Sequence, residues 1–171
     1  MKIKLMYIGK EDSEQINDAI LFYFNKIKYY IPYEVEAVPY LKNNKLSIEE
    51  QKKQEGTQIL KRIENSDYLV LLDEHGKELT SVDFSKFIQQ QMLRGTKRVV
   101  FLIGGAYGFS SEVYQRGDYK MALSQMTFPH ILTRLIFAEQ LYRAMTILKG
   151  EPYHHVWISY LPLLVNVKYV R

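Results

Sequence analysis

The chain has 171 residues, of which 47% are hydrophobic; this is the size of one domain with a substantial core and leaves no room for a two-domain enzyme. Cysteine is absent, which excludes a disulfide scaffold, a thiolate nucleophile and a cysteine-ligated zinc site and favours intracellular chemistry. The formal net charge of +4 permits a nucleic-acid partner without requiring one. No secretory signal is expected, because residues 1–4 lead directly into a short strand-like segment.

The first half of the chain predicts two strand-and-helix units. The expected elements are, in order, a strand over 2–8, a helix over 13–30, a strand over 34–38 and a helix from 47 to 61 or 63. Pro32 closes the first helical pattern, because proline disfavours helical backbone in the residue before it. Ser47 followed by Glu50 three residues later is the pattern of a capping box, which predicts where the second helix begins.

The second half continues the alternation. The expected elements are a strand over 68–72, a helix over 80–94, a strand over 98–103, a short helix over 111–116, a strand over 120–123 and a long helix over 129–148 stopped by Gly150. The uninterrupted apolar runs at 68–72 and 98–103 suit strands that are buried on both faces. The fold class is therefore α/β, with a mostly parallel sheet flanked by helices, and no linker divides it.

Ligands of open parallel sheets bind beyond the carboxyl ends of the strands, so the residues after each strand are the first candidates for a site. Three stretches qualify, namely 72–76, 104–108 and 124–129. Gly104 and Gly105 would allow a ligand to approach the main chain, although a tight turn explains the pair equally well. Neither the dinucleotide fingerprint nor a phosphate-binding loop with its lysine is present.

Five motifs occur together in a specific order between residues 2 and 154. They are LDEHGK at 72–77, LIGGAYG at 102–108, LSQMTFPH at 123–130, EQLYRA at 139–144 and GEPYH at 150–154. With these motifs the chain closely resembles the RlmH family of SPOUT-class methyltransferases, which modify a pseudouridine in 23S ribosomal RNA. The resemblance implies a C-terminal trefoil knot, an S-adenosylmethionine (SAM) site in that knot and a homodimer.

The resemblance also implies which residues bind the cofactor. They are Leu72, Gly104, Gly105, Leu123, Ser124, Gln125, Met126, Thr127 and Phe128. SAM has no phosphate, so backbone groups and apolar walls suffice, and Leu72 and Leu123 would enclose the adenine together with Met126 and Phe128. The alternative for Met126 and Phe128 is ordinary core packing. No metal is expected.

The methyl acceptor in the family is N3 of pseudouridine, which must lose a proton before or during attack on the methyl group, so a nearby base is needed. His154 is the candidate base, Tyr153 is the candidate for stacking on the target base, and Arg143 completes the expected catalytic set. His130, at the start of the last helix, is an alternative to His154. Arg134 is expected, with Arg143, to contact RNA phosphates.

The chain continues beyond the last motif. We expect one methyltransferase domain over 1–155 and an extension over 156–171, which is too short and too interrupted by Pro162 to cross a bilayer and which we expect to be ordered. The predicted function is SAM-dependent methylation of pseudouridine N3 in 23S rRNA on the assembled ribosome, by a cytoplasmic homodimer without membrane contact. The alternatives are a non-catalytic ribosome- or RNA-binding module and a small nucleotide-binding α/β protein.

Overall fold

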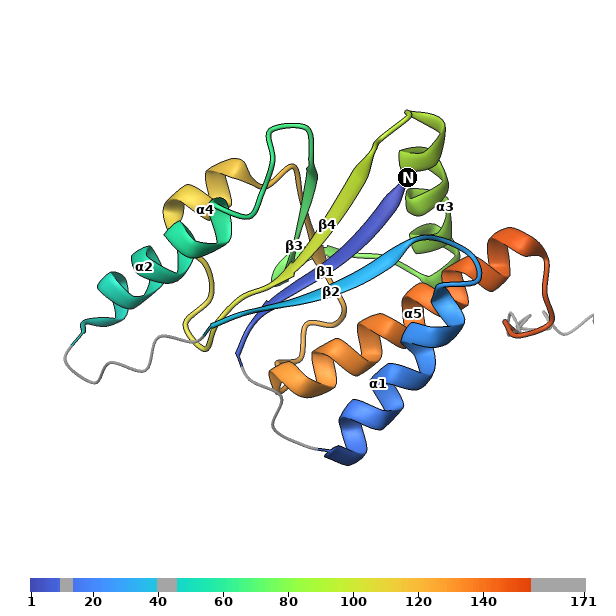
Figure 1. The fold of residues 1–171 in the computed structure, drawn as a ribbon, viewed down its shortest axis with the longest axis horizontal. Helices are drawn as coiled ribbons and strands as arrows, with labels where there is room; N and C mark the ends of the chain where they lie inside the picture. The colour runs from blue at the N-terminus through green and yellow to red at the C-terminus, as the bar shows by residue number, and fades with distance from the viewer. Residues whose placement is uncertain (10–13, 40–45, 155–171) are drawn as a thin grey trace, which may run out of the picture.

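The computed structural model describes residues 1–9, 14–39 and 46–154, and within them five parallel strands form one sheet (Figure 1). The strands are β1 (Lys2–Ile8), β2 (Tyr33–Val38), β3 (Tyr68–Glu78), β4 (Arg98–Ile103) and β5 (Tyr119–Ala122). The helices are α1 (Glu14–Ile27), α2 (Ile48–Leu60), α3 (Ser81–Leu93), α4 (Ser111–Arg116) and α5 (His130–Lys149). The strand order is β2-β1-β4-β3-β5, so the predicted α/β class with a parallel sheet is confirmed.

Local sequence signals define the helix ends. Ser47 and Glu50 form the predicted capping box, in which the Glu50 main-chain N–H donates to the Ser47 hydroxyl and the Ser47 N–H donates to the Glu50 carboxylate. Thr80 and Ser110 cap α3 and α4 in the same way, each accepting a main-chain hydrogen bond with its side chain. Gly150 ends α5 in the left-handed conformation at φ 69°, which a glycine adopts without steric penalty.

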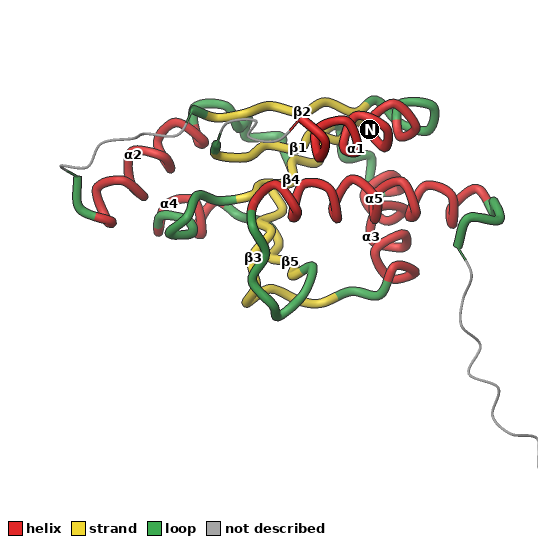
Figure 2. Tube along the Cα trace, turned by 90° about the horizontal axis from the view of Figure 1, so that it is seen from below, coloured by secondary structure: helices red, strands yellow, loops and turns green. Residues whose placement is uncertain are grey.

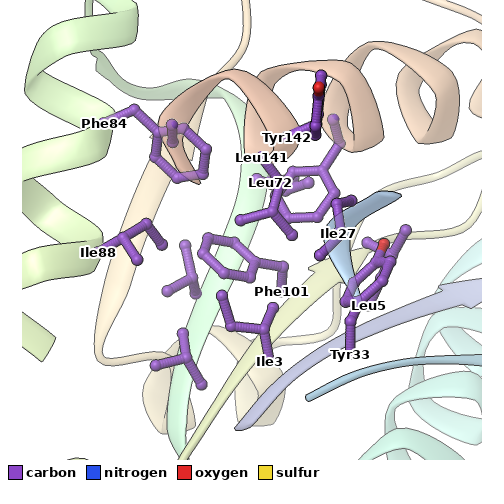
Figure 3. Packing of buried hydrophobic residues seen from close by; sticks show 14 of the residues in the cluster. Ile3, Leu5, Ile27, Tyr33, Leu72, Phe84, Ile88, Phe101, Leu141 and Tyr142 are labelled. Atoms are coloured by element: carbon purple, nitrogen blue, oxygen red, sulfur yellow. The ribbon is translucent and has the colours of Figure 1, made fainter. Parts of the chain in front are cut away.

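Helices cover both faces of the sheet. Figure 2 shows α2 and α4 on one side of the strands, with α1, α3 and α5 on the other. The larger core lies under α1, α3 and α5, where Phe101 of β4 packs against Phe84 and Phe137 (Figure 3). A smaller core on the opposite face includes Ile59 of α2 and Val113 of α4. Both faces of the central strands are therefore buried, which explains their continuous apolar sequences.

Strand β3 is longer than predicted. The expected strand over 68–72 continues to Glu78, but the pairing with β5 shifts register between Leu72 and Lys77, both of which pair with Met121. The residues between them bulge out of the sheet. A Cβ at Gly76 would lie 2.6 Å from main-chain atoms of Met121, so only glycine fits the return to the sheet. The prediction ended the strand too early because a bulge has no hydrophobic periodicity.

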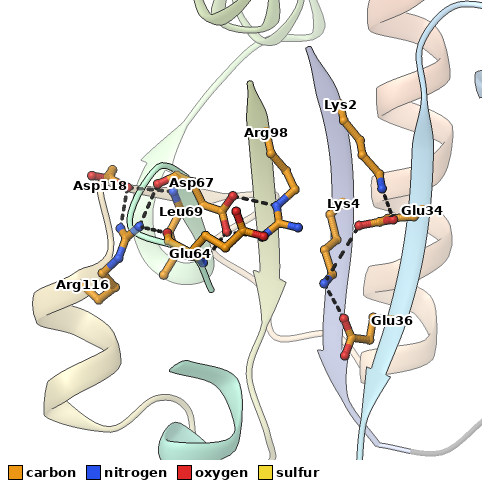
Figure 4. Close-up of polar contacts among 10 residues, drawn as sticks. All are labelled: Lys2, Lys4, Glu34, Glu36, Glu64, Asp67, Leu69, Arg98, Arg116 and Asp118. Carbon is orange, nitrogen blue, oxygen red and sulfur yellow. Dashed lines mark hydrogen bonds and ion pairs between the residues drawn. The ribbon is translucent and has the colours of Figure 1, made fainter. Parts of the chain in front are cut away.

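A network of ion pairs ties together the sheet near the start of β4 (Figure 4). Asp67, just before β3, accepts two hydrogen bonds of 2.6 Å from the Arg98 guanidinium. Arg116 at the end of α4 donates to the main-chain oxygen of Asp67 and to the Asp118 carboxylate. This network fixes the strand starts, away from the carboxyl ends where ligands bind.

The expected extension over 156–171 lies outside the described residues. The trefoil knot stays a prediction of the family resemblance, since strand order and pairing define the sheet and not the threading of its loops.

Candidate functional site

A pocket of about 450 Å³ opens at the carboxyl ends of β3, β4 and β5. This volume falls in the range of small-molecule sites. The lining residues come from the β3 bulge, the loop after β4, helix α4, the loop after β5 and the start of α5. They are Leu72, Asp73, Glu74, His75, Ile103, Gly104, Gly105, Ala106, Tyr107, Gly108, Phe109, Tyr114, Leu123, Ser124, Met126, Thr127, Phe128, His130 and Thr133.

Eight of the nine predicted cofactor residues line this pocket. The exception is Gln125, whose main-chain N–H and side-chain amide both donate to the Glu78 carboxylate at 3.1 and 3.3 Å, so it anchors the loop instead. Core packing, the alternative for Met126 and Phe128, is wrong for Met126, which is 72% exposed at the pocket. Phe128 is half-buried and also lines the pocket.

Hydrogen bonds between side chains hold the pocket loops together. Tyr114 of α4 donates to Asp73 in the β3 bulge at 2.5 Å, and burial together with this bond raises the pKa of Tyr114 to about 12. Thr127 in the loop after β5 donates to Glu74 at 2.7 Å. These two hydrogen bonds connect the bulge to α4 and to the loop after β5, and together they shape the mouth of the pocket.

The two glycines after β4 make room for neighbouring side chains. A Cβ at Gly104 would lie 3.0 Å from the ring of Phe109, and a Cβ at Gly105 would lie 2.5 Å from Oε2 of Glu55 on α2. From the sequence, we expected these glycines to give a ligand access to the main chain. In the structure, the atoms that a side chain at either position would meet belong to the protein itself. The glycines therefore let the loop lie flat over Phe109 and Glu55.

His130 and Arg134 lie one turn apart at the start of α5. His130 lines the pocket, and its buried Nδ1 has no hydrogen-bond partner within the described residues. Burial, and then the charge of Arg134, lower the pKa of His130, so its imidazole is neutral near pH 7. Arg134 is only 4% exposed and its guanidinium stacks on Tyr7 at 4.2 Å. The expectation that Arg134 contacts RNA phosphates is therefore wrong for this conformation, because its side chain is buried against Tyr7.

The predicted catalytic residues form a cluster at the other end of α5. Arg143 is paired with Glu139 at 2.5 Å, its Nη1 lies 3.5 Å from Nδ1 of His154, and its guanidinium stacks on the ring of Tyr153 at 4.8 Å. The Tyr153 hydroxyl donates to Glu139 at 3.2 Å. Hydrogen bonding to Glu139 raises the pKa of Arg143, so the guanidinium stays charged. The structure thus brings the three predicted residues together around the Arg143 guanidinium, and we call them the Arg143 cluster.

The Arg143 cluster lies far from the pocket of its own chain. Arg143 lies thirteen positions after His130 on α5, which at 1.5 Å per residue is roughly 20 Å. In Figure 1, α5 runs from the side where β1 ends back toward the side where β1 begins. Arg134, near the start of α5, and Arg143, in its second half, consequently lie toward opposite ends of this helix.

The charge of the pocket fits SAM, which carries a sulfonium cation and an amino-acid group. Asp73 and Glu74 contribute carboxylates to the wall, and no lysine or arginine is among the lining residues. Apolar surface comes from Leu72, Leu123 and Phe128. A cationic ligand with an apolar ring would match this combination, whereas a di- or triphosphate would meet repulsion, so the small nucleotide-binding alternative loses support.

Sequence reasoning missed several residues of the site. Asp73 and Glu74 stand in the stretch after β3 that was singled out, but no role was given to them. Tyr114 and Glu55 reach the site from helices α4 and α2, and nothing in their local sequence indicates it. In the described part of the chain, no group of three metal-ligating side chains is close enough to hold a metal ion, and no helix is long and apolar enough to span a membrane.

Comparison with known proteins identifies the family. A family profile described as "Predicted SPOUT methyltransferase" matches residues 1–154. The chain is 53% identical over 156 residues to a ribosomal RNA large subunit methyltransferase H from Christiangramia forsetii and, over the same length, to one from Parabacteroides distasonis; each match covers 91% of this chain and 99% of the relative.

Among solved structures, a probable methylase family protein from Haemophilus influenzae Rd KW20 shares the fold. Its TM-score is 0.50 at 11% sequence identity, over 90% of this chain and 70% of that one. The parallel sheet, the pocket at its carboxyl edge and these matches lead to one conclusion: the chain belongs to the SPOUT methyltransferase family, in the branch of the ribosomal RNA large subunit methyltransferase H proteins.

Proposed function

We propose that this protein transfers a methyl group from SAM to N3 of a pseudouridine in 23S rRNA of the assembled ribosome. Activity as an rRNA methyltransferase follows from the family. The observation that carries the finer proposal is the pocket itself, where eight residues expected from the family resemblance line one acidic and apolar cavity. A protein that acts on ribosomes works in the cytoplasm, which we propose as its location.

The pocket residues would hold the cofactor by shape and charge. When bound, SAM supplies an electrophilic methyl group on a sulfonium. Leu72, Leu123 and Phe128 would enclose the adenine, and the exposed Met126 would cover it from the solvent side. The flat main chain at Gly104 and Gly105 would lie against the ligand.

The acceptor nitrogen requires a group that takes its proton. We propose His154 as that base, since an imidazole transfers protons near neutral pH. Tyr153 is less suited, because burial and its hydrogen bonds, including the one to Glu139, raise the pKa of its hydroxyl well above the usual value. The neutral ring of Tyr153 would instead stack on the target base, and the charged Arg143 would orient both neighbours and neutralise phosphate.

A second copy of the chain would bring the Arg143 cluster to the pocket. Within one copy they lie roughly 20 Å apart along α5, which is too far for direct proton transfer. We propose a homodimer in which the Arg143 cluster of each copy faces the pocket of the other. A symmetric pair makes two such composite sites from the same two surfaces.

Methylation of isolated substrates tests the function. Ribosomes from a strain that lacks the activity should accept one methyl group per large subunit from SAM, at N3 of a pseudouridine located by mass spectrometry of rRNA digests. Deproteinised 23S rRNA is the control substrate and should react much more slowly, because only the folded ribosome presents the target. Binding of SAM and of ribosomes without methyl transfer would instead favour the non-catalytic alternative.

A further inference from the structure

Glu55 is a buried carboxylate directly behind the pocket. It lies on α2 and is 2% exposed. Its Oε1 accepts a hydrogen bond of 3.0 Å from the side-chain amide of Gln51, and its Oε2 lies 2.5 Å from the point that a Cβ of Gly105 would occupy. Because Gly105 lines the pocket, the main chain of a single residue separates this carboxylate from the cavity.

Two glycines, Gly56 and Gly105, allow α2 to approach the loop after β4. At Gly56, the residue after Glu55, a side chain would collide with the hydroxyl of Ser110, the N-cap of α4. At Gly105, a side chain would collide with Glu55 itself. Gly56 and Gly105 thus allow the Glu55 carboxylate to reach the back of the loop. An apolar residue at position 55 would pack there with a lower desolvation penalty.

Glu55 has no cationic partner among the described residues, since its one hydrogen-bond donor is the neutral amide of Gln51. Burial raises the pKa of Glu55, which shows that the environment disfavours its negative charge. A buried carboxylate of this kind is stabilised when a cation comes close. Gly105, beside Glu55, borders the pocket, so a cationic ligand held there would supply the complementary charge.

We propose that Glu55 is a binding residue that makes the pocket prefer the sulfonium form of the cofactor over the neutral thioether product. In methyl transfer a bond forms between the acceptor nitrogen, whose proton passes to the base, and the methyl carbon. The S–C bond breaks, its electron pair stays on sulfur, and S-adenosylhomocysteine (SAH) remains without the positive charge. The attraction to Glu55 acts before the reaction and is lost after it. Product therefore leaves more readily and is replaced by fresh cofactor.

The carboxylates at the pocket mouth are less effective for this purpose. Glu74 is exposed and already accepts a hydrogen bond from Thr127, and solvent and salt screen its charge. Glu55 is shielded from solvent by the loop and by α2, so its field reaches the cavity with less screening. Glu55 has this role only if the pocket holds SAM, as proposed above.

Calorimetry on the full chain tests the role of Glu55. The titrants are SAM, SAH and sinefungin, an analogue with an ammonium in place of the sulfonium methyl; the proteins are wild type, Glu55→Gln and Glu49→Gln. Gln keeps the size and the hydrogen-bonding capacity of Glu55 but removes its charge. Glu49 lies on the same helix with its side chain 82% exposed, which makes it the matched control.

In Glu55→Gln we expect SAM and sinefungin to bind about tenfold more weakly, with SAH changed by less than about twofold. Glu49→Gln should match wild type for all three. Equal weakening of SAM and SAH in Glu55→Gln would overturn the proposal, because it would show a purely structural role.

Wild-type protein alone provides a second readout, in case Glu55→Gln does not fold. SAM and sinefungin should bind more tightly than SAH, and an equal or tighter affinity for SAH would overturn the role of Glu55. If wild type binds none of the three ligands, the proposed function itself fails, which is a distinguishable result.

Discussion

At the scale of single residues, Gly104 shows how a small change would alter the pocket. A methyl group there would meet the Phe109 ring at 3.0 Å, and this ring packs edge-on against Tyr114 at 5.5 Å between centroids. Displacing Phe109 would thus move Tyr114 and, through the bond from Tyr114, Asp73. A side chain at position 104 would therefore displace the far wall of the pocket through a short series of steric contacts.

We expect a graded loss of SAM affinity in two variants of Gly104. Gly104→Ala should weaken binding by about tenfold, because the Phe109 side chain can give way by a few tenths of an ångström; Gly104→Val should weaken it by about 100-fold or more. Titration calorimetry measures both, and thermal unfolding checks that the fold persists. Unchanged affinity in Gly104→Val would remove this residue from the site.

His154→Ala should lower the methylation rate on ribosomes by about 100-fold or more, as loss of a positioned base does, with little change in SAM affinity. Lys86→Ala is the control, because this side chain on α3 is 64% exposed and belongs neither to the pocket lining nor to the Arg143 cluster. Single-turnover rates and calorimetry separate the two effects. Full activity in His154→Ala would make His130, with its unpartnered Nδ1, the better candidate base.

At the residue level, position relative to the strand ends was enough to predict which residues gather at one pocket; their contact with SAM stays a prediction. Leu72, Gly104 and Leu123 stand at or just after the ends of three predicted strands and meet at one pocket because the strands are parallel. Gln125 is the exception, because it lies outside the pocket lining and donates to Glu78 of β3. Glu55 was not among the predicted residues, because a helix on the opposite side of the loop approaches the pocket only through the three-dimensional packing.

At the scale of elements, the bulge in β3 supplies one wall of the pocket. We expect Gly76→Ala to destabilise the fold by about 2 kcal/mol, because its Cβ would press against main-chain atoms of Met121 at 2.6 Å. It should also weaken SAM binding, since the bulge carries Asp73 and Glu74. Urea unfolding measures the first effect and calorimetry the second.

Gly95→Ala is the control for the Gly76 variant. Gly95 has φ 71° but open space around it, so alanine there should cost about 1 kcal/mol of strain and leave SAM affinity intact. Equal SAM affinity in Gly76→Ala and Gly95→Ala would mean that the bulge does not shape the pocket.

The ion pair between Asp67 and Arg98 predicts a dependence of stability on pH. Burial raises the pKa of Asp67, but hydrogen bonds from Arg98 and from the Glu64 main chain lower it by more, so that the pKa lies below its usual value. The stabilisation is therefore present above the unfolded-state pKa of about 3.9 and is lost as pH falls through the lower folded-state pKa. Asp67→Asn should lower the free energy of unfolding by about 3 kcal/mol at pH 7, and the gap to wild type should shrink below about pH 4. Urea unfolding between pH 3 and pH 7 tests this; a gap that stays constant would contradict it.

Element positions were predictable because α2, α3 and α4 each begin at a capping residue and each buried strand has its own apolar run. The extension of β3 beyond Leu72 was not, since Asp73, Glu74 and His75 carry no strand pattern and return to the sheet only because Gly76 fits against β5. A bulge is specified by contact with its neighbour, and that contact is not visible in local sequence.

At the scale of the whole molecule, the distance between pocket and Arg143 cluster predicts complementation between inactive variants. Gly104→Val removes the pocket and His154→Ala removes the base. Mixed after partial unfolding and refolding, the two proteins should regain about a quarter of wild-type activity, because half of the dimers are mixed and each has one intact composite site. Methylation assays on ribosomes measure the recovery, and each variant refolded alone is the control. Absence of any recovery, in mixtures shown to contain mixed dimers, would place both halves of the site in one copy.

The strand order also governs when the protein can fold during its synthesis. The central strand β1 pairs with β2 and with β4, and the β4 partner of Ile3 is Val99, roughly 100 residues later in the chain. One edge of β1 therefore stays unpaired until more than half of the polypeptide has left the ribosomal tunnel, and contacts this distant in sequence are typical of slow folding. Nascent chains of this protein would expose an apolar strand edge for most of their translation, which makes them natural clients for chaperones that bind at the tunnel exit.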